Sequence, residues 1–177
     1  MTIQGYVFGL YDAKIAAWQA PQTWGAAQDL VSVDMMATDF ETVQGILHGN
    51  DQVMDVHARV ISAKLKVRVA FNTLAVWAIL SGESVVDSSP TSQSMVFGAT
   101  NRPYFGLAGR IDQTQGGGDL QIFIPKCKII GPISYAAEYG KYITPEMEAM
   151  GVLDSTVYGF GKLIQHSTAQ AVTVPPT

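Results

Sequence analysis

The sequence predicts one mainly β domain with a single short helix and two terminal arms. Three observations lead to this fold class. Several stretches of the 177-residue chain alternate apolar and polar residues, which is the pattern of half-buried strands. One segment, residues 72–82, combines apolar residues at helical spacing with signals for a helix start and a helix stop. Segments rich in Gly, Pro, Asn and Ser separate these stretches, as turns require.

A long hairpin is the first predicted unit. Residues 31–47 are strand-like, residues 48–51 (HGND) have turn chemistry, and a second strand follows at about residues 52–71. The alternation of apolar and polar residues changes phase within this second strand. We therefore expect a β-bulge or a bend near residues 61–63.

The second strand of this hairpin has a basic side. Lys64, Lys66 and Arg68 lie opposite the apolar residues of the same segment. The side lacks interleaved aromatic residues for base stacking, which argues against nucleic acid binding. We expect a solvated face, or a face whose cations pair with acids across an interface.

A short helix follows the basic strand. Asn72 is the predicted N-cap, and Ser81 with Gly82 provides the stop signal. Leu74, Trp77 and Leu80 recur at helical spacing. A helix this short is marginal alone, so we expect these three side chains to dock it on the sheet that it has just left.

The remaining segments are predicted with less regular patterns. Residues 1–30 form an extended arm with one helical turn around residues 13–18, and residues 82–94 form a polar, Ser-rich loop. The C-terminal segment is extended or disordered unless a partner holds it. The further strands are expected at residues 95–99, 104–112 and 120–130, the last two joined by the hairpin turn QTQGGGD, with two or three more after Gly131.

Composition limits the classes of function. The net charge of −4 and the pI near 5.2 argue against a surface that grips nucleic acid phosphates. We expect no signal peptide and no membrane span, and hence a soluble protein made in the cytosol. Charged residues make up only 15% of the chain and hydrophobic residues 47%, which favours burial of much of the surface against copies of the same chain.

No catalytic, cofactor or metal site is predicted. His48, His57 and His166 lack metal-ligand spacing. Glu146 and Glu148 lie on one face of a strand, where a solvated or interface role is favoured over acid catalysis. The only cysteine, Cys127, lies in a strand pattern and is interpreted as packing rather than as a nucleophile.

The order of motifs along the chain is more specific than any single motif. The chain runs through AAQDLVSVD, ILHGNDQV and FNTLAVWAILSG, and then through PYFGLAGRID, GGGDLQIFIPKCKI and TPEMEAMGVL. This succession, over about residues 26–166, resembles the major tail tube proteins of long, non-contractile-tailed bacteriophages. The resemblance implies a β-sandwich or partial barrel of antiparallel strands with one flanking α-helix.

The resemblance also implies an assembly. Residues 31–166 would form the tube domain between an N-terminal arm (1–30) and a C-terminal tail (167–177). Six subunits would close a large β-barrel ring, and stacked rings would form a hollow tube through which genomic DNA passes without specific binding. The implied partners are the tape measure protein and the tail tip or baseplate and tail terminator proteins, with assembly in the bacterial host cytoplasm and a final location in the virion tail.

The resemblance assigns contacts between subunits or rings to two groups of residues. These are the hairpin turn and the basic side of its second strand, namely His48, Gly49, Asn50, Asp51, Lys64, Lys66 and Arg68. Two alternatives are open at this stage. A monomeric β-barrel that binds a small ligand would have an apolar internal pocket, and an enzyme would use Cys127 or the glutamate pair.

Overall fold

The structure is a computed structural model that describes residues 10, 12–31, 33–49, 52–69, 73–89, 91–98, 101–113, 117–133, 139–140, 144–155 and 157–176. In chain order its elements are β1 (Asp12–Ala20), β2 (Thr23–Trp24), β3 (Gln28–Asp29), β4 (Val33–Gly49), β5 (Gln52–Val69), α1 (Leu74–Ser81), β6 (Val85–Ser89), β7 (Ser92–Met95), β8 (Phe105–Asp112), β9 (Asp119–Ile129), β10 (Glu146–Gly151) and β11 (Lys162–His166).

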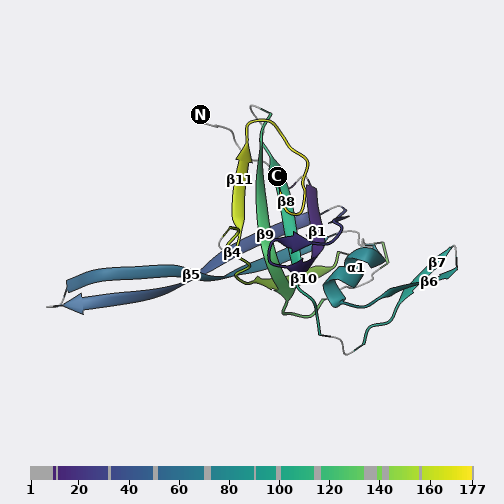
Figure 1. The fold of residues 1–177 in the computed structure, drawn as a ribbon, viewed down its shortest axis with the longest axis horizontal. Helices are drawn as coiled ribbons and strands as arrows, with labels where there is room; N and C mark the ends of the chain where they lie inside the picture. The colour runs from purple at the N-terminus through teal and green to yellow at the C-terminus, as the bar shows by residue number, and fades with distance from the viewer. Residues whose placement is uncertain are drawn as a thin grey trace.

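Nine of these strands form one open antiparallel sheet, shown in Figure 1. Its order is β2-β1-β8-β9-β10-β5-β4, with β3 added to β1 and β11 added to β9. The first part of β9 pairs with β11 and its last part with β10, so these two strands follow one another along one edge of β9. The predicted class, mainly β and antiparallel with one helix, is confirmed.

The sheet folds over on itself and encloses the core. On β5, the side chains of Ala63, Leu65, Val67 and Val69 are buried, and they belong to one cluster with residues of β1, β8, β9 and β10. The partners in this cluster are not all neighbours in the sheet. Met36 of β4 lies close against Gly109 of β8, and Phe40 lies against Gly161. This curvature corresponds to the predicted partial barrel or sandwich.

The long hairpin agrees with its prediction. β4 and β5 are antiparallel partners along their whole lengths, from Val33 opposite Val69 to Gly49 opposite Gln52. Their register shifts where Glu41 faces Ser62 and Thr42 faces Val60, which leaves Ile61 as an extra residue on β5. The bulge expected near residues 61–63 is therefore confirmed.

The helix starts one residue later than predicted. Its N-cap is Thr73, whose hydroxyl accepts a hydrogen bond from the N–H of Val76 at 3.4 Å; Asn72 lies outside the described residues. Gly82 ends the helix in the left-handed conformation (φ 80°) and donates its N–H to Ala78 at 2.8 Å. The predicted stop is confirmed, because this backbone conformation favours glycine.

The N-terminal segment is a strand where a helical turn was expected. β1 pairs with β8 over six residues, from Asp12 opposite Arg110 to Ala17 opposite Phe105, so the helical turn over residues 13–18 is wrong. The apolar residues of this segment alternate over too short a distance to distinguish a strand from a turn. Ala13 and Ile15 are buried in the core, which shows that tertiary packing decides the conformation here.

Both tryptophans of this segment pack on their own subunit. The indole N–H of Trp24 donates to the Pro125 carbonyl at 2.7 Å, and that of Trp18 donates to Asp154 Oδ1 at 2.7 Å. The indole of Trp24 covers Gly106 so closely that a Cβ there would lie 2.5 Å from it. Gly106 is therefore needed for this close approach.

The Ser-rich segment after the helix forms a hairpin. β6 and β7 pair from Val85 opposite Met95 to Ser89 opposite Ser92, so the predicted loop at residues 82–94 is wrong. The strand expected at residues 95–99 is also misplaced, because β7 ends at Met95. Serine and threonine suit a solvated two-stranded ribbon as well as a loop, which is why composition misled here.

The C-terminal half contains two more strands, β10 and β11, as expected. After β11, the C-terminal segment lies across β8 and β9, and Val172 is buried against Ala108 and Phe123. The division into an arm, a tube domain and a tail stays a prediction. Within the described part of the chain, no helix is long and apolar enough to span a membrane.

Candidate assembly interface

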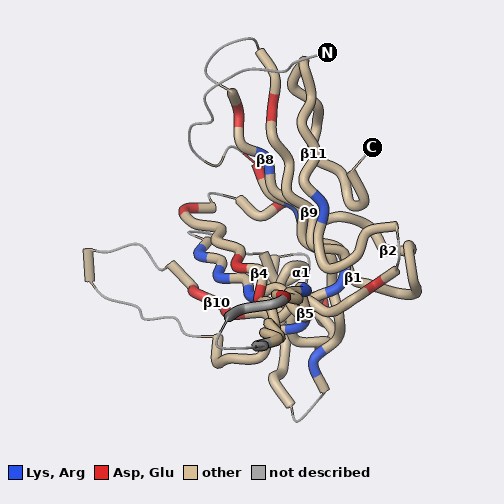
Figure 2. Tube along the Cα trace, turned by 90° about the vertical axis from the view of Figure 1, so that its left-hand side faces the viewer, with Lys and Arg blue, Asp and Glu red and all other residues tan. Residues whose placement is uncertain are grey.

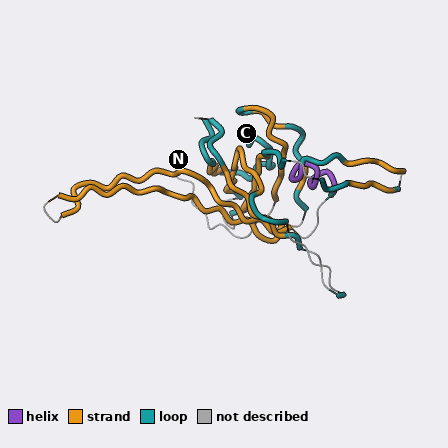
Figure 3. The backbone as a smooth tube through the Cα atoms, turned by 90° about the horizontal axis from the view of Figure 1, so that it is seen from below, coloured by secondary structure: helices purple, strands orange, loops and turns teal. Residues whose placement is uncertain are grey.

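The outer half of the β4–β5 hairpin leaves the body of the protein. The last pairing between β5 and β10 is Ala63 opposite Gly151, and beyond it β5 pairs with β4 alone. Figures 1 and 3 show this two-stranded ribbon extending away from the other elements. We call residues 42–49 and 52–60 the outer hairpin.

The register separates the outer hairpin into two faces. On one face, Thr42, Gln44 and Ile46 lie opposite Val60, Ala58 and Val56, so this face carries no charge. On the other face, Val43, Gly45 and Leu47 lie opposite Arg59, His57 and Asp55. Because side chains alternate along β4, the uncharged face continues the side of Phe40 that is turned to the core.

Aliphatic side chains are exposed on both faces. The exposed fractions are 52% for Ile46, 62% for Leu47 and 55% for Val56. A two-stranded ribbon with no third strand and no packed face is marginally stable in water, and contiguous exposed apolar residues mark interaction sites. The outer hairpin therefore has the character of a surface that another chain covers.

The inner half of the same hairpin carries the basic residues, and here the structure changes the interpretation. Lys64 pairs with Glu41, and Arg68 Nη2 pairs with Asp34 Oδ2 at 2.6 Å. Lys66 Nζ lies 2.6 Å from Glu146 Oε1 and 3.7 Å from Glu148 Oε1. The acids that neutralise the strand come from β4 and β10 of the same subunit.

This surface is therefore mixed in charge rather than basic. Figure 2 shows Lys and Arg among Asp and Glu where β4, β5 and β10 meet. The hydrogen bond to Glu41 raises the pKa of Lys64, and the hydrogen bond to Glu146 raises the pKa of Lys66. The pKa of Glu41 is lowered by the hydrogen bond from Lys64 and then by that from Ser62. Both kinds of shift keep the ion pairs charged at neutral pH.

Of the predicted turn contacts, His48 and Gly49 lie at the far end of the outer hairpin. The backbone of His48 and Gly49 ends β4, opposite Val53 and Gln52. The side chain of His48 and all of Asn50 and Asp51 lie outside the described residues. The role of these four residues in contacts between subunits stays a prediction.

The predicted helix contacts divide between the core and a pocket. Leu80 is fully buried, as is Val76, which the sequence analysis did not select. Leu74 and Trp77 are partly exposed. The ring of Trp77 lies 6.2 Å from that of Phe97 in an edge-on arrangement, so it packs on the segment after β7.

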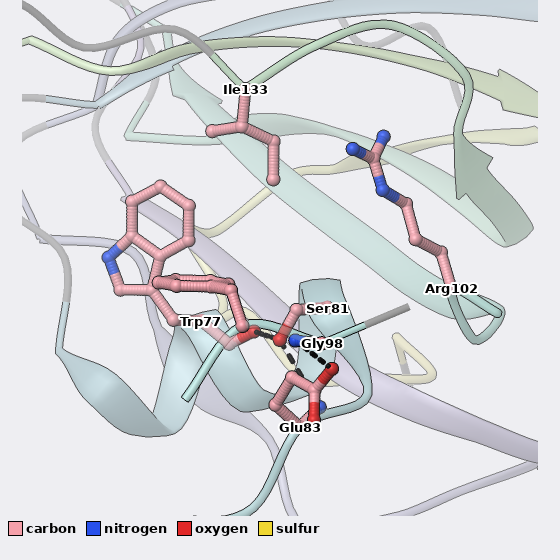
Figure 4. A pocket seen from close by; sticks show the side chains of 7 residues that line it. Trp77, Ser81, Glu83, Gly98, Arg102 and Ile133 are labelled. Atoms are coloured by element: carbon pink, nitrogen blue, oxygen red, sulfur yellow. Dashed lines mark hydrogen bonds between the residues drawn. The ribbon is translucent and has the colours of Figure 1, made fainter. Parts of the chain in front are cut away.

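The pocket beside Trp77 lies outside the sheet. Figure 4 shows its lining, which also includes Ser81, Glu83, Gly98, Arg102 and Ile133, around a volume of about 310 Å³. Glu83 Oε1 accepts a hydrogen bond from the N–H of Gly98 at 3.0 Å, and Arg102 Nη1 donates to the Gly131 carbonyl at 2.6 Å. A ligand-binding barrel would instead place its pocket inside a closed sheet, and the sheet of this chain is open.

The groups considered for catalysis have other partners. Cys127 is buried, its Sγ donates to the Phe105 carbonyl at 3.2 Å, and burial raises the pKa of the thiol. Glu146 and Glu148 face Lys66, as described above. Among the described residues, no group of three or more His, Cys, Asp and Glu side chains could hold a metal ion.

Sequence reasoning missed a buried polar cluster at the start of β9. Asp119 is fully buried and accepts hydrogen bonds from His166 Nδ1 at 2.6 Å, Gln121 Nε2 at 2.9 Å and the N–H of Gln170 at 3.0 Å. No spacing in the sequence indicates this cluster, because its members come together only when β11 and the C-terminal segment lie on β9. It fastens that segment to the sheet.

Sequence reasoning also missed the aliphatic residues of the outer hairpin, although a signal was present. Residues 42–47 contain no charged residue. In the structure, whose register shifts between Leu47 and His48, Ile46 lies opposite Val56, and this leaves a run without charge on one face. That uncharged run, rather than the basic side of the strand, indicates the surface that another chain would cover.

No protein-family model matches the chain, and no curated protein matches it. The chain is similar to solved structures from gene transfer agent particles. One is the tail of an empty particle, with C6 symmetry; it is 14% identical with a TM-score of 0.39, and the match covers 88% of this chain and 94% of that chain. Another is the virion of the native particle, with 14% identity, a TM-score of 0.36, and coverage of 88% and 95%. TM-scores this low do not establish a common fold.

Proposed function

We propose that this chain is a structural subunit that assembles with copies of itself into six-fold rings, and that stacked rings form the hollow tube of a phage-type tail. The observation that carries the proposal is the outer hairpin, which projects from the sheet with aliphatic side chains exposed on both faces. The order of motifs along the sequence, which resembles that of tail tube proteins, supplies the particular kind of assembly.

The open sheet supports ring closure. β4 pairs only with β5, so among the described residues its outer edge presents a long row of backbone groups without strand partners. Such an edge is a template for pairing with another chain. A barrel with a water-filled lumen needs about 16 strands or more, which exceeds what one chain supplies, so closure requires several copies.

The proposed contacts between rings are made by the outer hairpin together with the turn residues that the sequence analysis selected, namely His48, Gly49, Asn50 and Asp51. Lys64, Lys66 and Arg68 belong to the adjoining contact between subunits. Because each of these cations already has an acid of its own subunit as a partner, they contribute a mixed-charge surface rather than unpaired positive charge.

The proposal also names partners and a location. The tape measure protein would lie inside the growing tube, the tail tip or baseplate would start it, and the tail terminator would end it. Genomic DNA would pass through the lumen without specific binding, which the net charge of −4 favours. The subunit would be made in the bacterial host cytoplasm and would end in the virion tail.

Negative-stain electron microscopy of the purified chain over a concentration series, with analytical ultracentrifugation, tests the proposal. We expect rings or hollow tubes above a threshold concentration. A monodisperse monomer at every concentration, both alone and with a tail-tip complex added as a nucleus, would contradict it.

A further inference from the structure

We propose that the pocket beside Trp77 receives the tip of the outer hairpin from a second copy of the chain. This inference rests on the proposed function and names the surface that accepts the hairpin. The donor is the pair Leu47 and Asp55 near the hairpin tip. The acceptor is the apolar wall of the pocket together with Arg102.

The two surfaces lie at opposite ends of the molecule. In Figures 1 and 3 the β4–β5 hairpin extends in one direction along the longest axis, while α1 and the β6–β7 hairpin lie at the other end. The hairpin of one copy therefore cannot enter its own pocket. A donor at one end and an acceptor at the other form a head-to-tail contact, which either closes into a ring or repeats as an open stack, depending on the rotation between copies. The open stack is the arrangement that the proposed tube requires.

The acceptor has an apolar side and a cationic side, and its one acid, Glu83, accepts a hydrogen bond from the N–H of Gly98. In Figure 4, Trp77 lies on one side of the pocket, Ile133 lies above it and Arg102 reaches in from the opposite side. Phe97 is also part of the lining and is 65% exposed, although its ring packs edge-on against Trp77. The guanidinium of Arg102 uses one nitrogen for the Gly131 carbonyl and carries five N–H donors in all.

The donor presents the matching pair of groups. Leu47 and Asp55 are directly opposed across β4 and β5, so both side chains project from the same face. Side chains opposed in this way have Cβ atoms about 4.5–5.5 Å apart. Within the described residues, Asp55 has no ion partner in its own chain. One short segment therefore carries an exposed aliphatic group beside an exposed carboxylate.

The two pairs fit in one orientation. Leu47 enters the side of the pocket formed by Trp77 and Ile133, and the carboxylate of Asp55 then faces the guanidinium of Arg102. A carboxylate and a guanidinium form charge-assisted, often bidentate hydrogen bonds. The cavity of about 310 Å³ is at the lower end of the range for small-ligand sites, which suits a few side chains.

One such contact is weak alone. A hairpin tip covers less than the roughly 800 Å² per partner that a stable interface buries. Six copies of the contact between two rings act together, because formation of one raises the effective concentration of the others. The inference therefore predicts a sharp concentration threshold for stacking.

A charge exchange tests the pairing. Asp55→Arg and Arg102→Asp should each raise the threshold concentration for tubes by about tenfold or more, and the double variant should lower it again towards the wild-type value. Asp87→Arg, which places a new arginine on β6 away from the pocket lining, is the control and should leave the threshold unchanged. Wild-type thresholds for both single variants, or no recovery in the double variant, would overturn the pairing.

A cross-link tests the position without depending on the strength of the contact. Leu47→Cys and Phe97→Cys in one chain should give a ladder of disulfide-linked copies in tubes, while Leu47→Cys with Val86→Cys should not. The native Cys127 is buried and does not compete. Tubes without a specific ladder would overturn the inference and leave the proposed function standing. Failure of the wild-type chain to form rings or tubes would overturn both.

Discussion

The β4–β5 hairpin has two halves that differ in what covers them. In the inner half, one face lies in the core and the other is held in ion pairs with acids of β4 and β10. In the outer half, aliphatic side chains are exposed on both faces. Both halves belong to one continuous ladder with one bulge between them. An alternating pattern thus specifies which side of a strand is apolar, while neighbouring elements decide whether that side is buried by the same chain.

The difference between the two halves is clearest for two valines of the same strand, β5. Val67 of β5 is 3% exposed and Val56 of the same strand is 55% exposed. Val67→Ala should lower the free energy of unfolding of the subunit by about 2–3 kcal/mol, through lost burial and a cavity. Val56→Ala should change it by less than about 0.5 kcal/mol. Urea denaturation at a concentration below the assembly threshold measures both, and equal losses would mean that the outer hairpin is covered within the monomer.

A buried carboxylate gives the next largest effect. Asp119 lies at the end of the sheet, where its three hydrogen bonds hold β11 and the C-terminal segment. Asp119→Asn keeps the shape of the side chain but removes the charge and one acceptor. We expect a loss of about 1–2 kcal/mol in the free energy of unfolding. Asp154→Asn, at a partly buried acceptor of the Trp18 indole, should cost less in the same denaturation experiment.

The same group predicts a dependence on pH. Burial raises the pKa of Asp119, but the hydrogen bonds from Gln121, Gln170 and His166 outweigh it, so the pKa lies below its ordinary value of 3.8. A pKa that is lower in the folded chain than in the unfolded chain adds stability above the unfolded value. This part of the stability is present above pH 3.8 and is lost as the pH falls through the folded pKa. In a plot of the free energy of unfolding against pH, Asp119→Asn should reduce the slope at acid pH. An unchanged slope would mean that other carboxyl groups cause the acid dependence.

Local patterns were sufficient to predict most elements whose neighbours in sequence are also their neighbours in space, with the solvated β6–β7 hairpin as the exception. The hairpin at residues 33–69, its bulge at Ile61 and the stop at Gly82 follow from alternation and turn chemistry. β1 was missed because its partner β8 lies far away in the sequence. The ion pairs of Lys66 were missed for the same reason, since their acids lie on β10, which is distant in sequence from β5. The Asp119 cluster joins β9, β11 and the C-terminal segment, and no local pattern encodes such an encounter.

The ion pairs of the inner half should contribute little to stability. Lys66→Met leaves Glu146 and Glu148 on one face without their shared cation, and we expect a loss below about 1 kcal/mol because such pairs are solvated. The loss should shrink at high ionic strength, where charges are screened. Arg59→Met in the outer half is the matched control. Arg59 has no ion partner among the described residues, so its removal should show no comparable salt dependence.

The smallest effect on stability should accompany the largest effect on assembly. Ile46→Asn and Val56→Asn together make the uncharged face of the outer hairpin polar without altering the core, so the monomer should unfold within about 0.5 kcal/mol of the wild type. The same change removes the aliphatic surface that another copy would cover, and tubes should fail to form at concentrations where the wild type assembles. Thr42→Asn, at a polar position of that face, is the control. Wild-type tubes from the double variant would show that the outer hairpin extends into solvent in the assembly, and the open edge of β4 would then have to carry the contacts between copies.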